Sequence, residues 1–306
     1  LSPFEMHGAL HVENGKLTDQ HGDVVQLYGM STHGIAWFPQ YVNPDAFRTL
    51  RDDWNTNCIR LAMYTAEDGG YCSGGDKERL KQLVKDGVSY ATDLGMYVIV
   101  DWHILSDGDP NQNKDEAIAF FKEMAETFTN NDNVLYEICN EPNGGTSWES
   151  IKAYAEEVIP VIREKRPDAV ILVGTPTWSQ EIDKAAKSPL EDKNVMYTLH
   201  FYAGTHKDDL RNRLESYAQN GLPIFVSEFG MCDASGNGAN DFESTTKWLD
   251  LLNKYQISFM CWNLANKDES SSVFRANSTK ISDWTEEDLS EAGQWIKAYF
   301  KNRSYQ

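Results

Sequence analysis

Two glutamates, each at the end of a short apolar run, carry most of the chemistry that this sequence offers. Glu141 follows Asn140 in VLYEICNEP, and Glu228 lies in PIFVSEFG. A carboxyl group that keeps its proton can act as an acid, while a second one that stays ionised can act as a nucleophile. Further polar side chains lie on or just after similar runs, where they can orient these carboxyls: Arg60, His103, Asn140, His200 and Tyr202.

Eight apolar, β-branched runs recur along the chain and predict eight strands. They begin near residues 25, 58, 97, 134, 169, 195, 223 and 257, at intervals of 26 to 39 residues. Each interval fits a strand, a crossover helix and their loops. The runs are apolar throughout, which is typical of parallel strands covered on both faces. We therefore expect an α/β protein with a (β/α)8 TIM barrel.

The segments between the runs have the spacing of amphipathic helices. Pro44 and Asp45 predict the start of the first helix, and Gly95 predicts a helix end just before a strand. In the last segment we expect one helix from Glu286, with acidic residues in its first two turns, where the helix dipole favours anions. Its apolar face comprises Leu289, Ala292, Trp295, Ile296, Tyr299 and Phe300.

The whole chain of 306 residues reads as a single catalytic domain, 1–306. Residues 1–24 predict a small hairpin, and 25–303 predict the barrel, with no linker-like stretch between them. Polar, glycine-rich segments at 65–77, 105–116 and 231–241 each follow a predicted strand. In a barrel such loops lie on the face that carries active sites.

Composition excludes several classes of partner and environment. Lys and Arg number 28 and Asp and Glu 47, giving a net charge of −19 that repels phosphate backbones and anionic lipids. We therefore expect neither nucleic acid nor a membrane as a partner. There is no apolar run of membrane-spanning length and no signal peptide in this chain. Of the five cysteines, Cys72 and Cys232 lie in glycine-rich loops, and a bridge between them is left open.

A pair of carboxyl groups at the ends of the predicted strands suits the cleavage of a glycosidic bond. One acid protonates the leaving oxygen, and a second carboxylate acts on the other side of the anomeric carbon. The fourth and seventh strands lie across a barrel mouth from each other, so Glu141 and Glu228 can flank a sugar. Arg60 and Tyr202, if aimed at Glu228, would hold it ionised as a nucleophile. Glu141 has fewer cationic neighbours and would stay protonated.

The chain resembles the bacterial endo-β-1,4-glucanases (cellulases) of glycoside hydrolase family five, in the clan of retaining (β/α)8 glycosidases. The strings that carry the resemblance are NCIRLAMY, VIVDWHILSDGDP, YEICNEPNG, HFYAGTH, SEFG and CWNLANKDESSS. They extend over all but the N-terminal hairpin and the C-terminal tail. The resemblance implies a secreted, extracellular enzyme that acts on β-1,4-glucan and cello-oligosaccharides.

The resemblance also implies a role for each matched position. Glu141 matches the acid/base and Glu228 the nucleophile, with Arg60 and Tyr202 supporting the nucleophile. His103 and His200 would order the site, and Asn140 would hydrogen-bond a sugar 2-hydroxyl. Trp262 would be the platform under the sugar at the cleavage site. The other positions matching residues that line glucose subsites are His33, Trp37, Tyr64, Trp178, Ala234, Lys267 and Glu269.

Other reaction classes fit the sequence less well. Seven histidines are present, but none forms the HxH or HExxH pair that a zinc site favours, so no metal or other cofactor is expected. No GxxxxGK[ST] or GxGxxG motif follows a strand, and Ser227 lacks a GxSxG context.

Two alternatives remain within carbohydrate recognition. The same carboxyl pair would serve hydrolysis of mannan, xyloglucan or lichenan, and Lys267 and Glu269 favour unsubstituted β-1,4-glucan by resemblance alone. A non-catalytic binding barrel would be expected to have lost one of the two carboxyls, and both are present. Nothing in the sequence requires more than a monomer.

Overall fold

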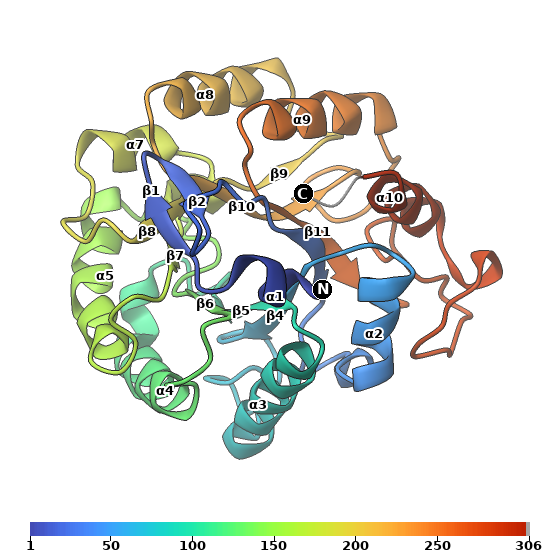
Figure 1. Cartoon of the computed structure of the whole chain (residues 1–306), viewed down its shortest axis with the longest axis horizontal. Coiled ribbons are helices and arrows are strands. Elements are labelled where there is room, and N and C mark those ends of the chain that lie inside the picture. The colour runs from blue at the N-terminus through green and yellow to red at the C-terminus, as the bar shows by residue number, and fades with distance from the viewer. Residues whose placement is uncertain (304–306) are drawn as a thin grey trace.

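Parallel strands close into a barrel inside a ring of helices (Figure 1). The computed structural model describes residues 1–303; residues 304–306 of the expected domain lie outside the described residues. The barrel strands are β3 Tyr28–Thr32, β4 Cys58–Tyr64, β5 Tyr97–His103, β6 Val134–Glu137, β7 Ile171–Val173, β8 Val195–Thr198, β10 Ile224–Gly230 and β11 Phe259–Leu264. β11 pairs with both β3 and β10, which closes the sheet, and the short β9 Phe201–Tyr202 continues β8 along β10. The expected TIM barrel is confirmed.

Helices connect the successive strands on the outside of the barrel. The α-helices that follow the N-terminal α1 (Pro3–His7) are α2 Pro44–Asp52, α3 Lys77–Asp93, α4 Lys114–Thr127, α5 Trp148–Arg163, α6 Pro176–Ser179, α7 Ile182–Lys187, α8 Asp208–Gln219, α9 Phe242–Lys254 and α10 Glu291–Lys301. The 3-10 turns are η1 Pro39–Tyr41, η2 Pro110–Asn113 and η3 Glu286–Asp288. Asn43 caps α2 just before Pro44, and Gly95 takes a φ of 66° after α3, as the sequence predicts. Every helix among residues 1–303 is too short or too polar to span a bilayer.

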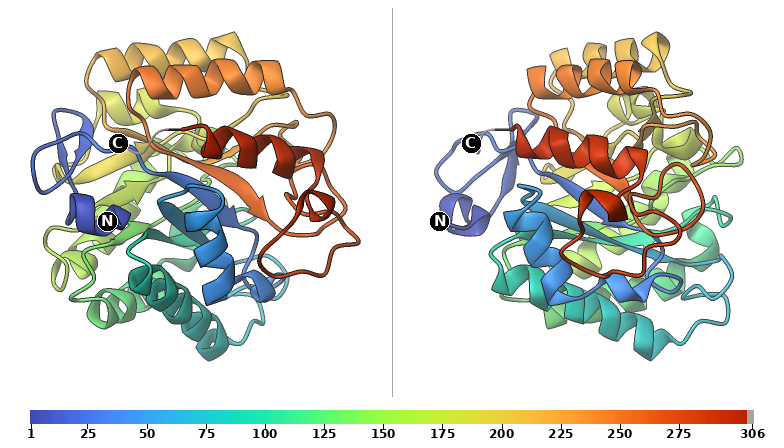
Figure 2. Two further views of the ribbon diagram at one scale, coloured as in Figure 1. Left: turned by 45° about the vertical axis from the view of Figure 1, so that its right-hand side comes forward. Right: turned by 90° about the vertical axis from the view of Figure 1, so that its right-hand side faces the viewer.

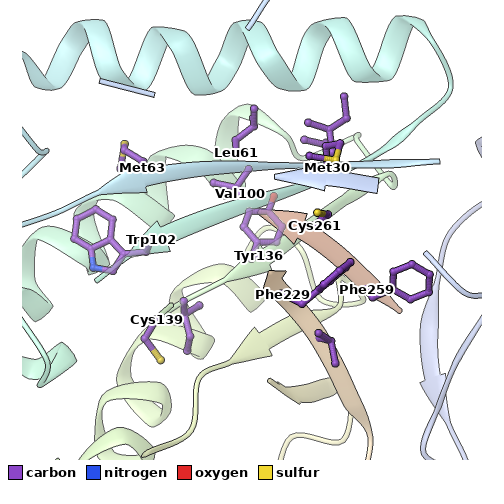
Figure 3. Packing of buried hydrophobic residues seen from close by; sticks show 14 of the residues in the cluster. Met30, Leu61, Met63, Val100, Trp102, Tyr136, Cys139, Phe229, Phe259 and Cys261 are labelled. Carbon is purple, nitrogen blue, oxygen red and sulfur yellow. The ribbon is translucent and has the colours of Figure 1, made fainter. Parts of the chain in front are cut away.

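Alternation along the strands divides the buried side chains into two layers. On β5, Val98, Val100 and Trp102 belong to the cluster that packs between strands and helices, part of which is shown in Figure 3. Ile99 belongs instead to a cluster inside the barrel. The next inward position on the same strand is Asp101, because side chains two apart share a face. The barrel interior therefore changes from apolar to polar toward the carboxyl ends of the strands.

The N-terminal segment closes the apolar end of the barrel. Helix α1 Pro3–His7 is followed by the antiparallel hairpin of β1 His11–Glu13 and β2 Lys16–Thr18. Leu17 on β2 is 1% exposed and packs into the cluster inside the barrel. Figure 2 shows this segment on the side of the barrel opposite the long loop that follows β11. The expected hairpin is confirmed, and α1 is an addition to it.

The prediction that the last helix starts at Glu286 is wrong. Glu286–Asp288 form the separate turn η3, Leu289 is extended and bridges Phe274, and α10 begins only at Glu291. Ser290 causes the break, because its hydroxyl accepts the Gly293 N–H as the cap of a new helix. Burial of Leu289 against the barrel outweighs the helical spacing.

One smaller expectation is corrected, and one open question is answered. The first barrel strand begins at Tyr28 and not near Val25, because Val25 and Leu27 pack beneath the barrel with the hairpin. Cys72 and Cys232 carry free thiols, so no bridge joins them.

Truncation of Leu17 tests whether the hairpin contributes to barrel stability. Leu17→Ala should lower the free energy of unfolding by about 2–4 kcal/mol, because it leaves a cavity under the barrel. Val24→Ala, at a position 37% exposed, is the control and should change it by less than about 0.5 kcal/mol. Urea unfolding measures the change in both variants. A change in Leu17→Ala as small as that expected for the control would mean that the hairpin adds nothing to the core.

Candidate active site

Arg60 lies inside the barrel on β4, and its fully buried guanidinium contacts the expected nucleophile. Nη1 donates to Glu228 Oε1 at 3.0 Å, while Nε and Nη2 donate to the two carboxylate oxygens of Glu137 at 2.9 and 3.0 Å. Nη2 also lies 2.7 Å from Asn140 Oδ1 and 3.0 Å from Asp101 Oδ2. One cation thus faces three buried carboxyl groups and offsets their mutual repulsion.

Asp101 and Glu137 were not among the residues expected at the site. The alternation of side chains along each strand could nevertheless have indicated them. Asp101 lies two residues before His103 on β5, and Glu137 lies two residues after Leu135, which belongs to the cluster inside the barrel. Residues two apart on a strand share a face, so both charges had to face inward.

Glu228 reaches the barrel interior because β10 departs from strict alternation. Val226 and Phe229 are three residues apart, yet both belong to the outer cluster, and the pairing with β11 shifts register between them. This bulge directs two successive residues, Ser227 and Glu228, inward. The Tyr202 hydroxyl donates to Glu228 Oε2 at 2.5 Å. Burial raises the pKa of Tyr202 well above its usual range, so the phenol keeps its proton and donates it to this hydrogen bond.

The hydrogen bonds of His103 define its tautomer. Nδ1 lies 2.5 Å from Asp101 Oδ2, and Nε2 lies 3.2 Å from Asn140 Nδ2. The Asn140 orientation is set by Arg60, which donates to Oδ1, so its nitrogen must donate toward His103. Burial lowers the pKa of His103 well below its usual range. His103 is therefore neutral, with its proton on Nδ1.

The fully buried Asn140 has both hydrogens of its side-chain amide engaged. They face the Ile104 carbonyl at 2.9 Å and His103 Nε2. In this arrangement Asn140 aligns Arg60 and His103 with each other. The expected hydrogen bond to a sugar hydroxyl stays a prediction, and it would use the remaining capacity of Oδ1.

Glu141 lies just beyond β6 in a different environment from Glu228. Its Oε2 is 2.8 Å from His200 Nδ1, and its side chain is 13% exposed. Burial raises the pKa of Glu141 to about 8, with Arg60 opposing the shift. Burial also lowers the pKa of His200 to about 4, so the imidazole is neutral. Glu141 consequently carries a proton at neutral pH.

The two carboxyl groups meet at the mouth of the barrel. Oxygen atoms of Glu141 and Glu228 and a ring nitrogen of His200 lie within 4.8 Å of one another. Carboxyls about 5 Å apart are typical of glycosidases that form a covalent intermediate, whereas about 6.5–9.5 Å leaves room for a water. In the described part of the chain these residues also form the one set spaced to share a metal ion. The Arg60 guanidinium on Glu228 opposes a cation there.

A cleft of about 560 Å³ opens above the carboxyl pair. All eight residues expected to bind substrate line it: His33, Trp37, Tyr64, Trp178, Ala234, Trp262, Lys267 and Glu269. Among its other lining residues, not foreseen from the sequence, are Glu67, Leu105, Gln180, His206, Ser235 and Gly236. Glu67 is held across two loops, because Ser106 donates both its backbone N–H and its hydroxyl to Oε1.

One wall of the cleft is aromatic. Trp37 is 42% exposed and stacks on Tyr64 with centroids 4.9 Å apart. Trp262 lies parallel to His103 at 5.2 Å. His33 contacts three of these side chains, and burial lowers its pKa to about 3, so it is neutral. Such rings pack against the C–H face of a sugar.

Trp178 projects into the cleft from a strained turn. Residues 177 to 179 have φ of 58°, 54° and 58°, a region that bulky residues rarely adopt. The turn is held by the Trp178 N–H, which donates to the Pro142 carbonyl at 2.8 Å, and by the Ser179 hydroxyl, which donates to the Asn140 carbonyl. These hydrogen bonds connect the turn to the loop that carries Glu141, while the side chain of Trp178 stays 47% exposed.

Charged groups of the lining lie beside the aromatic wall, next to His33. Lys267 Nζ lies 3.3 Å from Glu269 Oε2, and Glu269 Oε1 lies 3.9 Å from His33 Nε2. Ala234 contributes backbone, and its N–H donates to Thr205 at 2.9 Å. The lining therefore combines flat apolar rings with hydrogen-bonding groups, which suits a neutral, hydroxyl-rich chain.

Comparison with known proteins agrees with this geometry. The family model described as cellulase (glycosyl hydrolase family 5) matches residues 18–268. Endoglucanase A of Butyrivibrio fibrisolvens is 50% identical over 96% of this chain and 68% of its own length. Endoglucanase 5 of Pectobacterium carotovorum subsp. carotovorum is 49% identical over 97% of this chain and 58% of its own length. The chain thus spans 58 to 68% of these two relatives.

Solved structures show the same likeness across the whole barrel. Cellulase Cel5C_n has a TM-score of 0.95 and 43% identity, over 99% of this chain and 94% of that one. The catalytic domain of Thermobifida fusca endoglucanase Cel5A, solved in complex with cellotetraose, has a TM-score of 0.94 and 40% identity. That comparison covers 99% of this chain and 100% of the other.

Replacement of Arg60 tests how much its contacts with the buried carboxyls contribute to the free energy of unfolding. Arg60→Lys keeps one charge but loses the fork that reaches several acceptors, so unfolding free energy should fall by about 3 kcal/mol. Arg48→Lys changes an exposed arginine paired with Asp283 and should stay within about 0.5 kcal/mol of the unmodified protein. Urea unfolding at pH 7 measures both. Equal stability of the two variants would show that the buried fork is dispensable.

Proposed function

Because the chain belongs to the cellulase family, glycosyl hydrolase family 5, we propose that its barrel hydrolyses internal β-1,4-glucosidic bonds in cellulose and related β-glucans. The observation that carries the proposal is the pair of carboxyls with oxygen atoms within 4.8 Å. Burial raises the pKa of Glu141 to about 8, while a guanidinium and a phenol hold Glu228. Such a pair can supply a proton and a nucleophile to one linkage.

In the first step Glu228 attacks the anomeric carbon and forms a glycosyl-enzyme. Arg60 donates to one of its oxygens and Tyr202 to the other, which orients the carboxylate. Glu141 gives its proton to the departing oxygen, as its pKa of about 8 allows at neutral pH. In the second step the ionised Glu141 takes a proton from water, which attacks the same carbon and releases the sugar with net retention.

The cleft supports an extended, unsubstituted glucan as substrate. Trp37, Trp178 and Trp262 offer flat surfaces at separate points of the lining, and Lys267 and Glu269 offer groups for hydroxyls. The related Thermobifida fusca domain was solved with cellotetraose, a β-1,4-linked chain of this kind. Mannan, xyloglucan and lichenan share the chemistry and stay as alternatives, as does a barrel that binds without cleaving.

We also propose an extracellular monomer. Cellulose is an insoluble polymer that does not cross a membrane, so an enzyme that attacks it must work outside the cell. Among residues 1–303 the large apolar side chains left exposed are Leu1, Val24, Trp37, Trp178 and Ile281. Two of these line the cleft, and scattered apolar residues of this number do not require a partner subunit.

Two glutamine variants separate the roles of the carboxyls. Glu228→Gln should lower turnover of every substrate by at least about 10³-fold, since no nucleophile remains. Glu141→Gln should still release dinitrophenol from 2,4-dinitrophenyl cellobioside in a burst, because this leaving group needs no proton, and should then stall. Glu243→Gln, with a side chain 86% exposed, is the control for the chemical change. A burst from Glu228→Gln instead would reverse the assignments.

An initial-rate panel tests the substrate. With carboxymethylcellulose, glucomannan, xyloglucan and lichenan compared, kcat/KM should be highest on the unbranched β-glucans, because side branches clash with the aromatic lining. Viscosity of carboxymethylcellulose should fall before many reducing ends form, as internal cleavage requires. A higher value on glucomannan or xyloglucan would move the assignment to that polymer. Binding of cello-oligosaccharides without new reducing ends would favour the non-catalytic alternative.

A further inference from the structure

Ser227 and Glu137 are buried residues to which the proposed mechanism gives no role. His200 Nε2 lies 2.7 Å from Ser227 Oγ, and Ser227 Oγ donates to Glu137 Oε2 at 2.9 Å. On the other side of the ring, His200 Nδ1 lies 2.8 Å from Glu141 Oε2. A continuous chain of hydrogen bonds therefore runs from the acid at the cleft to a carboxylate inside the barrel.

The donor and the acceptor of each hydrogen bond in this chain can be assigned by starting from Glu137. Arg60 donates to both oxygens of Glu137, so this carboxylate is an acceptor and Ser227 must donate to it. The Ser227 oxygen is then free to accept a hydrogen from His200 Nε2. A neutral imidazole that is protonated on Nε2 has only an acceptor at Nδ1. Glu141 must supply the hydrogen of the remaining bond.

We propose that Ser227 and Glu137 are positioning residues that hold His200 in its Nε2-protonated tautomer and so keep the catalytic proton on Glu141. The inference rests on the proposed function, since it concerns how that acid is prepared. In the second step the same tautomer leaves the ionised Glu141 facing an acceptor, which makes it a stronger base toward water. Burial, which raises the pKa of Glu141 to about 8, acts in the same direction.

Glu137 also connects the two halves of the site. Its carboxylate ends the chain from Glu141 and shares Arg60 with the nucleophile Glu228. The titratable and charged groups that surround His200 and Glu141 come from five strands. They are Arg60 and Tyr64 on β4, Asp101 and His103 on β5, Glu137 on β6, Tyr202 on β9 and Glu228 on β10. Arg60 stabilises an ionised Glu141, whereas Asp101 and Glu137 oppose it.

The test compares Ser227→Ala with Ser227→Thr, which keeps a hydroxyl at the same place. Without the hydroxyl, His200 is free to move its proton to Nδ1 and donate to an ionised Glu141, so the pKa of Glu141 should fall. Activity that needs the protonated acid is present below that pKa and lost above it. For p-nitrophenyl cellobioside, the alkaline limb of kcat/KM should lie near pH 8 in the unmodified enzyme. In Ser227→Ala it should move down by about one pH unit, which is about a tenfold loss on that limb.

Two controls make the outcome specific. Ser227→Thr should restore the limb. For 2,4-dinitrophenyl cellobioside, kcat/KM reports formation of the glycosyl-enzyme and should be alike for all three proteins, because this leaving group needs no proton. An equal loss with both substrates at every pH would indicate general damage and contradict the proposal. An alkaline limb that stays near pH 8 in Ser227→Ala would also contradict it. Nitrogen-15 NMR of the His200 ring reads the tautomer directly and should show Nε2–H with Ser227 and Nδ1–H with alanine. That result does not depend on turnover, so it stands even if no β-glucan is cleaved; an Nδ1–H ring in the unmodified protein would refute the inference.

Discussion

The site depends on one buried guanidinium. Arg60 lies where the barrel interior changes from apolar to polar, and three carboxyl groups converge on it from β5, β6 and β10. Without a cation, such a cluster would protonate or unfold, because burying several like charges together costs several kcal/mol each. With it, Glu228 keeps a fixed orientation and Glu137 serves as the inner end of the chain that reaches Glu141.

The two glutamates differ in role because they differ in surroundings. Glu228 has a guanidinium and a phenol on its two oxygens. Glu141 faces a neutral imidazole, and its side chain is mostly buried, so its pKa rises to about 8. The same side-chain type thus acts as nucleophile at one strand end and as acid at another, as the environment of each carboxyl directs.

Much of this was predictable from the sequence, and the exceptions have physical causes. Apolar runs of strand length are a strong signal because both faces of a parallel strand are buried, so all eight strands were expected. Polar residues on or just after those runs indicated Arg60, Glu141 and Glu228. The bulge that turns Ser227 and Glu228 inward together leaves no local mark, since it arises from pairing with β11. The break at Leu289 was missed because tertiary burial overrides helical spacing, and the left-handed turn at Trp178 depends on contacts with another loop.

In the proposed mechanism two carboxyls act on opposite sides of one anomeric carbon, at a separation too short for a water between them. Proton NMR of cello-oligosaccharide hydrolysis, recorded within the first minutes before the anomers equilibrate, tests it most directly. With two displacements at the same carbon, the newly formed reducing end should appear first as the β-anomer, which then converts slowly to the equilibrium mixture. First appearance of the α-anomer would mean direct attack by water, and would contradict both the covalent intermediate and the role given to Glu228.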